Sequence, residues 1–249
     1  VQISAVTGEG SAANIDMLDM HFAQLGFVQS DVAYYAYNGI RFEQYEGAPI
    51  TSFKALAALY NETVQLVTCN PEIKSMDDLR GKSVSLGAAG SGVYFNAMDF
   101  LAAYDMTEED IVPQYLSFAD SAEALKDGKI DAAFIVAGAP TNAVTSLAAT
   151  NDVYLVGLDS EHVADLIEMS PYYSESVISA DTYGTPTDVT TVAIAAVIIV
   201  DNDISEDAVY DFVSTIFENL GSLTHAKAGE CSVEFAASIT DVPYHAGAA

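Results

Sequence analysis

The stretch MDDLRGKSVSLGAAGSGVYFN, Met76–Asn96, is the most informative part of this chain. It predicts a strand over Ser83–Leu86, then a loop rich in glycine and serine, then a helix that begins at Val93. The first N–H groups of a helix have no partner inside the helix and carry partial positive charge. This loop is therefore a candidate site for a carboxylate or a phosphate.

The loop matches neither of two common functional motifs. No lysine follows Gly92, which excludes a phosphate-binding loop of the G-x-x-x-x-G-K-[ST] type. Ala89 stands where the nucleophile elbow of hydrolases needs its first glycine. Similar turns also occur in α/β proteins that bind nothing there, so the local pattern leaves binding open.

Composition bounds the class of protein. With 249 residues and 51% hydrophobic content, the chain can form one large or two medium domains. No apolar run approaches the roughly 18 residues that a membrane span needs. The longest candidate, Val192–Val200, predicts a buried strand. No signal segment is visible in this chain, so we expect any leader to have been removed upstream.

The charge balance is strongly acidic. There are 36 acidic residues and 8 basic ones, for a net charge of −28. Nucleic acids and anionic membrane surfaces both need a basic footprint on the protein, so the sequence argues against both as partners. The acidic residues are dispersed along the chain, which is typical of a solvated surface on a folded domain.

Cysteine and histidine patterns indicate no metal centre. Cys69 and Cys231 form no C-x-x-C pair, and the four histidines lie far apart in the sequence. The sequence therefore predicts no metal site. Whether the two cysteines pair in an oxidising compartment or stay as free thiols is left open.

Helical and strand-like segments alternate along the chain, which predicts an α/β fold with a largely parallel sheet. A first strand is predicted over Val1–Val6 and an irregular stretch over Pro171–Pro186. Three loops share one design, in which small residues connect a strand end to a helix start: Gly8–Ser11, Gly87–Gly92 and Gly138–Thr141. We expect a site built from backbone amides and small hydroxyl groups.

Polar residues at the end of the strand that starts at Phe27 are further candidates. Gln29 and Ser30 have no evident core role there, and strand ends are where open α/β sheets bind ligands. Asp31 either caps the following helix or contacts an ammonium group of a solute. Ser11 either caps its own helix or contacts the solute.

The later loops offer candidates with the same two interpretations. Gly138 and Pro140 either shape their loop or contact the ligand directly, and Thr141 opens the helix that follows. Tyr183 either lines the site or packs in the core.

At this point the chain resembles the TAXI-type solute receptors of tripartite ATP-independent periplasmic (TRAP) transporters. The matching segments occur in the family's order and cover nearly the whole chain. They are Thr7–Ile15, Val28–Gly39, Ile73–Ala97, Leu125–Thr141, Thr182–Val200 and Val242–Ala248. Two departures stand out: Val93 occupies a position where the family commonly has threonine, and the family's first strand, glycine loop and helix are missing before Val1.

The resemblance implies a two-lobed fold of the type II periplasmic-binding-protein class, with a hinge and an interlobe cleft. Residues 1–86 with 190–249 would form lobe I, and residues 87–189 would form lobe II. It further implies a monomeric, non-enzymatic receptor without a cofactor, located in the periplasm or otherwise outside the cytoplasm, either free or membrane-anchored. Such a receptor delivers a small amino acid or organic acid to TRAP membrane permease subunits.

Our sequence-based hypothesis for binding follows from this. The carboxylate of the solute accepts hydrogen bonds from the N–H groups of Ser91, Gly92 and Val93, and from the Ser91 hydroxyl. The opposite lobe supplies Ser11, Gln29, Ser30 and Asp31. Closure of the hinge then buries the solute.

Two other functions remain open at this stage. The first is a ligand-sensing module with the same fold and a signalling partner. The second is a serine hydrolase using Ser91, which the missing elbow and the absence of a placed histidine disfavour.

Overall fold

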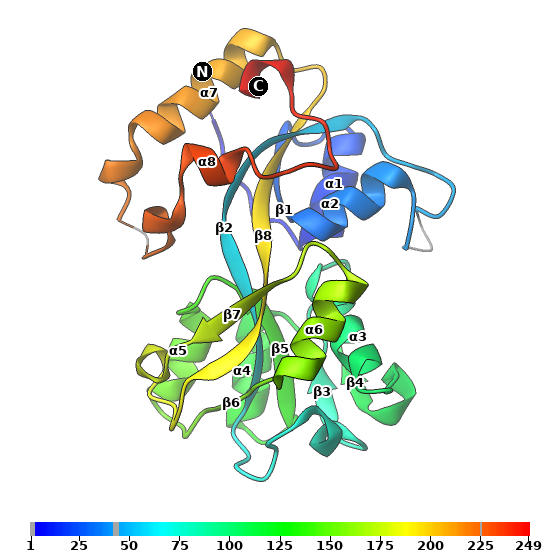
Figure 1. Ribbon diagram of the computed structural model, residues 1–249, viewed down its shortest axis with the longest axis vertical. Coiled ribbons are helices and arrows are strands. Elements are labelled where there is room, and N and C mark those ends of the chain that lie inside the picture. Colours follow the sequence, from blue (N-terminus) through cyan, green and yellow to red (C-terminus); the bar gives the residue numbers. More distant parts are fainter. Residues whose placement is uncertain (1–2, 42–44, 225) are drawn as a thin grey trace. The chain divides into compact units, whose positions relative to one another are not determined.

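The computed structural model describes residues 3–41, 45–224 and 226–249. The chain divides into two compact units (Figure 1): unit 1 is Val1–Asn61 with Ala195–Ala249, and unit 2 is Glu62–Ile194. Two long strands, β2 (Phe53–Thr68) and β8 (Val189–Asp201), run through both units. Each unit is described by itself below.

The unit boundaries lie inside these two strands, after Asn61 and after Ile194. The sequence places the lobe boundaries later on the first crossing, after Leu86, and earlier on the second, after Val189. The difference has a physical origin in the sheet. Residues of β2 from Thr63 onward pair with β5 and β6, so the second half of this strand belongs with unit 2.

Unit 1 has a small sheet segment covered by helices. Its helices and short strand are α1 (Ser11–Asp19), β1 (Leu25–Gln29), α2 (Ser30–Asn38), α7 (Glu206–Glu218) and α8 (Val233–Ala236). β1 pairs antiparallel with β8, with Phe27 opposite Ile198. The core of the unit includes Leu56, Ile198 and Val209. Short 3-10 turns follow α7 and close the chain: η4 (Leu220–Ser222), η5 (Ala226–Glu230) and η6 (Ala246–Ala248).

The predicted first strand, Val1–Val6, is wrong for the part that the structure describes, because residues 3–10 form no helix or strand. Residues 1 and 2 lie outside the described part. The outer edge of β1, where another strand could pair, forms hydrogen bonds with side chains of α1 instead. Asn14 Nδ2 donates to the Phe27 carbonyl at 2.7 Å, and the Gln29 N–H donates to Ser11 Oγ at 3.0 Å. Side chains that satisfy an edge in this way protect it from further pairing.

Unit 2 contains most of the sheet. Its strands are β3 (Ser83–Ser85), β4 (Val112–Gln114), β5 (Ala132–Ala137), β6 (Tyr154–Val156) and β7 (Ser174–Ile178). Its helices are α3 (Val93–Ala103), α4 (Phe118–Lys126), α5 (Asn142–Ala148) and α6 (Ser160–Met169). Its 3-10 turns are η1 (Met76–Leu79), η2 (Glu108–Asp110) and η3 (Ala180–Thr182).

The strand order in the sheet is β1-β8-β2-β5-β3-β4, with β6 beside β2 and β7 beside β8. β3 pairs in parallel with β4 and with β5. The pairs β1–β8, β2–β5, β2–β6 and β7–β8 are antiparallel. The prediction of a largely parallel sheet is therefore wrong, because the two long strands run against their neighbours and only β3, β4 and β5 keep the parallel order.

The core of unit 2 lies between this sheet and its helices. Phe100 of α3 packs edge-on against Phe134 of β5, with ring centroids 5.7 Å apart. Both side chains are fully buried, as are Leu86 and Leu101. Burial of such side chains, worth about 1.5–3 kcal/mol each, anchors α3 on the sheet.

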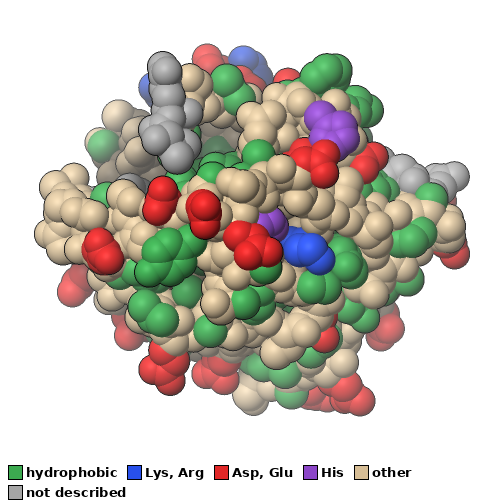
Figure 2. Space-filling model, turned by 90° about the horizontal axis from the view of Figure 1, so that it is seen from above, with side chains coloured by type: hydrophobic (Ala, Val, Ile, Leu, Met, Phe, Trp, Pro, Cys, Tyr) green, Lys and Arg blue, Asp and Glu red, His purple; other side chains and the backbone are tan. Residues whose placement is uncertain are grey.

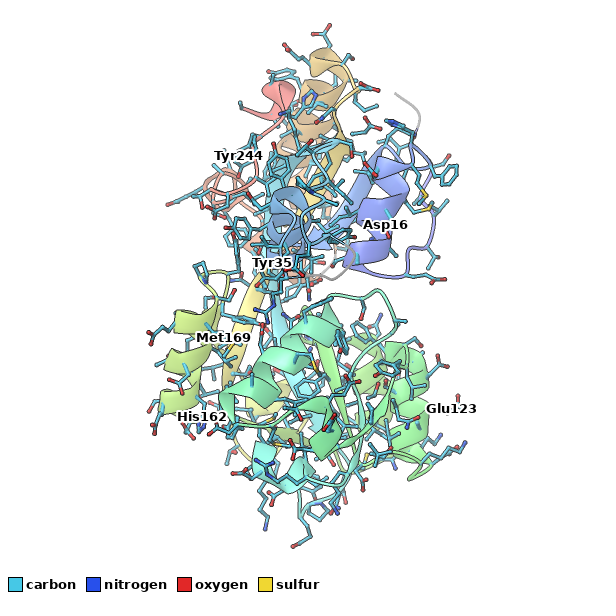
Figure 3. The ribbon with its side chains drawn as sticks, turned by 90° about the vertical axis from the view of Figure 1, so that its right-hand side faces the viewer. Asp16, Tyr35, Glu123, His162, Met169 and Tyr244 are labelled. Atoms are coloured by element: carbon cyan, nitrogen blue, oxygen red, sulfur yellow. The ribbon has the colours of Figure 1, made fainter. Side chains whose placement is uncertain are left out.

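The region after β6 departs most from the sequence-based expectation. The sequence did not indicate α6, although Asp159 caps it by accepting the N–H groups of Glu161 and His162. β7 lies inside the stretch that the sequence predicts to be irregular, Pro171–Pro186, and pairs with β8. In Figure 3, His162 and Met169 mark the two halves of α6. Within the described residues, no helix is both long and apolar enough to cross a membrane.

Candidate binding site

Two of the predicted loops leave the same edge of the unit 2 sheet. β3 and β5 are parallel neighbours, with Ser85 opposite Ala133. The carboxyl ends of parallel strands face one way, and open α/β sheets place ligands outside that edge. The loop after β3 leads to α3 and the loop after β5 leads to α5, so the fold brings these two candidate segments of unit 2 to one end of the sheet.

The first loop contains a buried hydroxyl group that no protein atom uses. Ser91 is 7% exposed, and among the described residues its Oγ has no hydrogen-bond partner. Its backbone N–H donates to the Ala88 carbonyl at 3.0 Å, so this amide is already engaged. α3 begins at Val93, as predicted, with Gly92 as N-cap and no side-chain cap in the described part of the chain. The unpaired donors of this helix terminus follow Ser91 directly.

Gly87 makes the approach of these groups possible. Its φ of +87° lies in the region that side chains rarely adopt. A Cβ atom placed there would lie 2.5 Å from Val93 Cβ and 2.8 Å from Ser91 Oγ. The loop thus folds back so closely on the start of α3 that no other residue fits at this position.

The second loop uses its polar groups internally. The Thr141 N–H donates to Tyr183 Oη at 2.7 Å, and Thr141 Oγ1 donates to the Gly138 carbonyl at 3.2 Å. Pro140 is exposed and follows Ala139 through a cis peptide bond. Burial raises the pKa of the Tyr183 phenol, so the hydroxyl stays protonated at neutral pH. Thr141 and Tyr183, both predicted as ligand residues, are therefore bonded to each other.

The predicted residues of unit 1 are also brought together. Ser11, Gln29, Ser30 and Asp31 are all buried, with 9% exposure or less. Ser11 is not the cap of its helix, as one interpretation held, because Gly10 occupies the N-cap and Ser11 Oγ accepts the Gln29 N–H instead. Asp31 lies in the first turn of α2, where its Oδ1 accepts the Val32 N–H at 2.7 Å.

The two arginines of the chain, Arg41 and Arg80, each contact another side chain. Arg80 Nη1 lies 3.0 Å from Asp110 Oδ1, and Arg41 lies over the ring of Tyr35, 5.3 Å from its centroid. Figure 2 shows carboxylates scattered over the face it presents, with few lysine or arginine side chains among them. Backbone N–H groups and hydroxyls, and not guanidinium groups, are the donors that these loops offer to an anion.

Ser91 is not arranged as a nucleophile. An activated serine needs a base within about 2.6–3.2 Å of its hydroxyl. Within the described residues, no side chain bonds to Ser91 Oγ. The Ser91 hydroxyl can therefore donate a hydrogen bond to an oxygen atom of a ligand. It does not have the contact with a base that acyl transfer needs.

Some functional candidates escaped prediction from the sequence. Gln65 is buried in β2 and bonds to both Thr141 and Tyr183. Asn96 Nδ2 donates to Tyr173 Oη at 2.8 Å, and this hydroxyl donates to Asp99 Oδ2 at 2.9 Å. The available signal was a polar side chain between two apolar neighbours, such as Gln65 between Val64 and Leu66.

A group of possible metal ligands lies in unit 1. His21, Asp201 and Asp203 each offer a ligand atom, and these atoms lie within 4.8 Å of one another. His21 Nδ1 is 2.6 Å from Asp201 Oδ2, and this contact raises the pKa of His21. The sequence did not indicate the group, because His21 and Asp201 are far apart along the chain. Cys69 and Cys231, left open above, are both free thiols.

Several solved structures have a similar fold at low sequence identity to this chain. The alkanesulfonate-binding protein SsuA from Xanthomonas axonopodis pv. citri, bound to MOPS, matches with a TM-score of 0.54 and 15% identity over 96% of this chain and 68% of that chain. The GluR0 ligand-binding core from Nostoc punctiforme, in complex with L-glutamate, matches with a TM-score of 0.50 and 16% identity over 88% of this chain and 78% of that chain.

A putative L-cystine ABC transporter protein from Listeria monocytogenes matches with a TM-score of 0.50 and 15% identity, over 94% of this chain and 78% of that chain. These similarities confirm the mixed α/β fold of type II periplasmic binding proteins. The model of the NMT1-like family matches residues 1–249. The chain therefore belongs to the NMT1-like family.

Proposed function

We propose that this protein is an extracytoplasmic solute receptor. It binds a small carboxylate-containing solute, an amino acid or an organic acid, and delivers that solute to a membrane permease. The resemblance described above favours a TRAP permease as the partner. In this proposal units 1 and 2 are the two lobes, the receptor acts as a monomer, and it performs no chemical reaction on its solute.

One observation carries the proposal, namely the buried hydroxyl of Ser91 that no protein atom uses. A buried hydroxyl without a partner costs about 1–3 kcal/mol. This hydroxyl directly precedes the N-terminus of α3, where the helix leaves N–H donors unused. An anionic oxygen of a solute would satisfy both.

The named ligands of similar structures agree with an anionic head group. MOPS is bound to the alkanesulfonate-binding protein and L-glutamate to the GluR0 core. We propose that the solute of this chain presents one such group to Ser91, Gly92 and Val93. Ser11, Gln29, Ser30 and Asp31 contact the rest of the solute, with Asp31 favouring an ammonium group. Gly138, Pro140, Thr141 and Tyr183 complete the set.

A thermal-shift screen tests the proposal, because a solute that binds only the folded state raises the melting temperature. The panel contains L-glutamate, L-glutamine, dicarboxylates, keto acids and an alkanesulfonate. We expect one class to raise the melting temperature, and the Ser91→Ala, Gln29→Ala double variant to lose that shift. A shift that survives in the double variant contradicts the proposed contacts. No shift in any class, together with hydrolysis of an ester panel, contradicts the receptor function.

Ser170→Ala is the matched control. Ser170 is 2% exposed, and its Oγ also has no partner among the described residues, but it follows α6 and is not one of the predicted contacts. Its removal should leave the solute-induced shift unchanged. The permease is tested separately by reconstitution with TRAP or with ABC membrane components, of which only one should accept the loaded receptor.

A further inference from the structure

Gln65 lies at the centre of a closed hydrogen-bond ring in unit 2. Tyr183 Oη donates to Gln65 Oε1 at 2.6 Å, and it accepts the Thr141 N–H at 2.7 Å. Gln65 Nε2 donates to Thr141 Oγ1 at 3.0 Å and to the Ala137 carbonyl at 3.3 Å. The ring therefore joins the C-terminal part of β2, the loop that leads to α5, and the segment around η3.

Both polar groups of the Gln65 side chain, the amide oxygen and the NH₂ group, have hydrogen-bond partners in the ring. A carboxamide has one oxygen that accepts and an NH₂ group that donates twice. The oxygen of Gln65 accepts the only hydrogen of the Tyr183 hydroxyl. The NH₂ group lies within hydrogen-bond distance of three oxygen atoms, of which Thr141 Oγ1 and the Ala137 carbonyl are nearer than the Thr63 carbonyl at 3.5 Å. A leucine could not hold any of these partners, and a carboxylate could not donate to the Ala137 carbonyl.

The burial of Gln65 makes its hydrogen bonds important for the structure of the loop. Gln65 is 1% exposed, so water cannot replace its bonds when the side chain changes. Burying a polar group without a partner is costly, so the ring is stable when complete and strongly weakened when one member is lost. The loop Gly138–Thr141 and Tyr183 are thereby held in one geometry.

We propose that Gln65 is a positioning residue of the solute site. It fixes the Thr141 amide and the Tyr183 hydroxyl on each other, so that the loop before α5 and the Tyr183 ring present a preformed surface to the solute. This role rests on the proposed function, because Gly138, Pro140, Thr141 and Tyr183 belong to the proposed solute contacts. Preformed geometry reduces the ordering cost of binding.

Amide hydrogen exchange of Thr141 tests the ring without any solute. We expect exchange of this amide to be about tenfold faster or more in Gln65→Leu and in Tyr183→Phe, because each opens the ring. Tyr183→Phe removes a member of the ring that lies outside β2, so it still tests the ring if Gln65→Leu does not fold. The double variant should exchange no faster than the faster single variant, since both changes break one unit.

Thr191→Val is the matched control. Thr191 is also 1% exposed, and its Oγ1 donates to the Val64 carbonyl at 2.8 Å, beside Gln65 but outside the ring. This variant loses one buried hydrogen bond and some stability but should leave Thr141 exchange unchanged. Equal Thr141 exchange in Gln65→Leu and Thr191→Val overturns the proposal.

Calorimetry with L-glutamate and with L-malate distinguishes a failure of the positioning role of Gln65 from a failure of the proposed receptor function. If the protein binds either probe, Gln65→Leu should weaken the affinity about tenfold and Thr191→Val less than about twofold. An unchanged affinity in Gln65→Leu overturns the positioning role. If the wild-type protein binds no solute of the full panel, the proposed function fails, and the positioning role in a solute site fails with it. Faster Thr141 exchange in the variants would then still show the ring itself.

Discussion

The loop Gly87–Gly92 and the loop Gly138–Thr141 follow parallel neighbouring strands and both consist of small residues, yet their polar groups differ in their partners. The first leaves a buried hydroxyl, Ser91 Oγ, without a partner among the described residues. The second bonds its threonine amide to Tyr183 and its threonine hydroxyl to Gly138 and Gln65. Among the described residues, the first loop therefore keeps one polar group that the protein does not use, whereas the threonine of the second loop is bonded within the protein.

The difference lies in the side chains that other elements bring to each loop. β2 supplies Gln65 and the segment after η3 supplies Tyr183, so the second loop finds partners. No described side chain reaches Ser91 Oγ in the same way. A local sequence design therefore does not decide whether the polar groups of a loop find partners within the protein. Three variants break or sharpen this contrast, a fourth tests a contact outside both loops, and they are ordered by expected effect.

Gly87→Ala should have the largest effect. The substitution combines an unfavourable positive φ with contacts of 2.5 and 2.8 Å to the side chains of Val93 and Ser91. We expect a loss of about 2–4 kcal/mol in the free energy of unfolding, measured with urea. Gly128→Ala is the control, because Gly128 has φ +66° and a Cβ atom added there would have no neighbour within 4 Å. It should cost only about 1 kcal/mol. Equal losses would show that the first loop is not closely packed.

Tyr183→Phe should cost about 1–3 kcal/mol in the free energy of unfolding, because the Thr141 N–H and Gln65 Oε1 lose their partner. Tyr210→Phe is the control, since Tyr210 is 65% exposed and should not change stability. Urea denaturation of both variants gives the comparison. An unaltered stability in Tyr183→Phe would mean that the second loop is as open as the first.

Ser91→Ala should leave the free energy of unfolding within about 0.5 kcal/mol of wild type or raise it, because the hydroxyl that it removes has no partner. Binding of the solute identified by thermal shift should nevertheless weaken about tenfold, the effect of one lost hydrogen bond to a charged group. Urea denaturation and calorimetry measure the two effects. A large loss of stability with unchanged binding would reverse the assignment of this loop.

His21→Gln tests a contact that belongs to neither loop and should have the smallest effect. Asp201 raises the pKa of His21, so the folded state holds this proton more tightly than the unfolded state. The stabilisation is fully present below about pH 6.5, the ordinary histidine value, and is lost as pH rises through the higher folded value. The stability difference between wild type and His21→Gln should therefore be larger at pH 6 than at pH 9. A difference that grows with pH contradicts this interpretation.

The sequence predicted the local elements around the first loop well. The predicted strand Ser83–Leu86 is β3 (Ser83–Ser85), and α3 begins at Val93, because glycine punctuation and apolar runs are local signals. Strand direction was predicted poorly. Antiparallel pairing of β2 with β5 depends on two segments some 70 positions apart, for example Gln65 and Ile135, and no local pattern records it.

The sequence likewise predicted single candidate residues of the site but not the contacts between them. Ser91 was proposed from its place before a helix, and the structure adds that its hydroxyl is buried and unused. Thr141 and Tyr183 were proposed one by one, whereas their mutual bond depends on the fold. Gln65 was missed because an amide between apolar neighbours in a strand does not show which groups it will meet.

The sequence by itself determined the acidic character, the alternation of helices and strands, and the small-residue loops at strand ends, since each depends on composition or on neighbours in the chain. Only the tertiary structure decided which loop has its polar groups bonded within the protein. Gln65, Thr141 and Tyr183 come from three distant segments, and their hydrogen bonds exist only after the sheet has brought those segments within about 3 Å of one another.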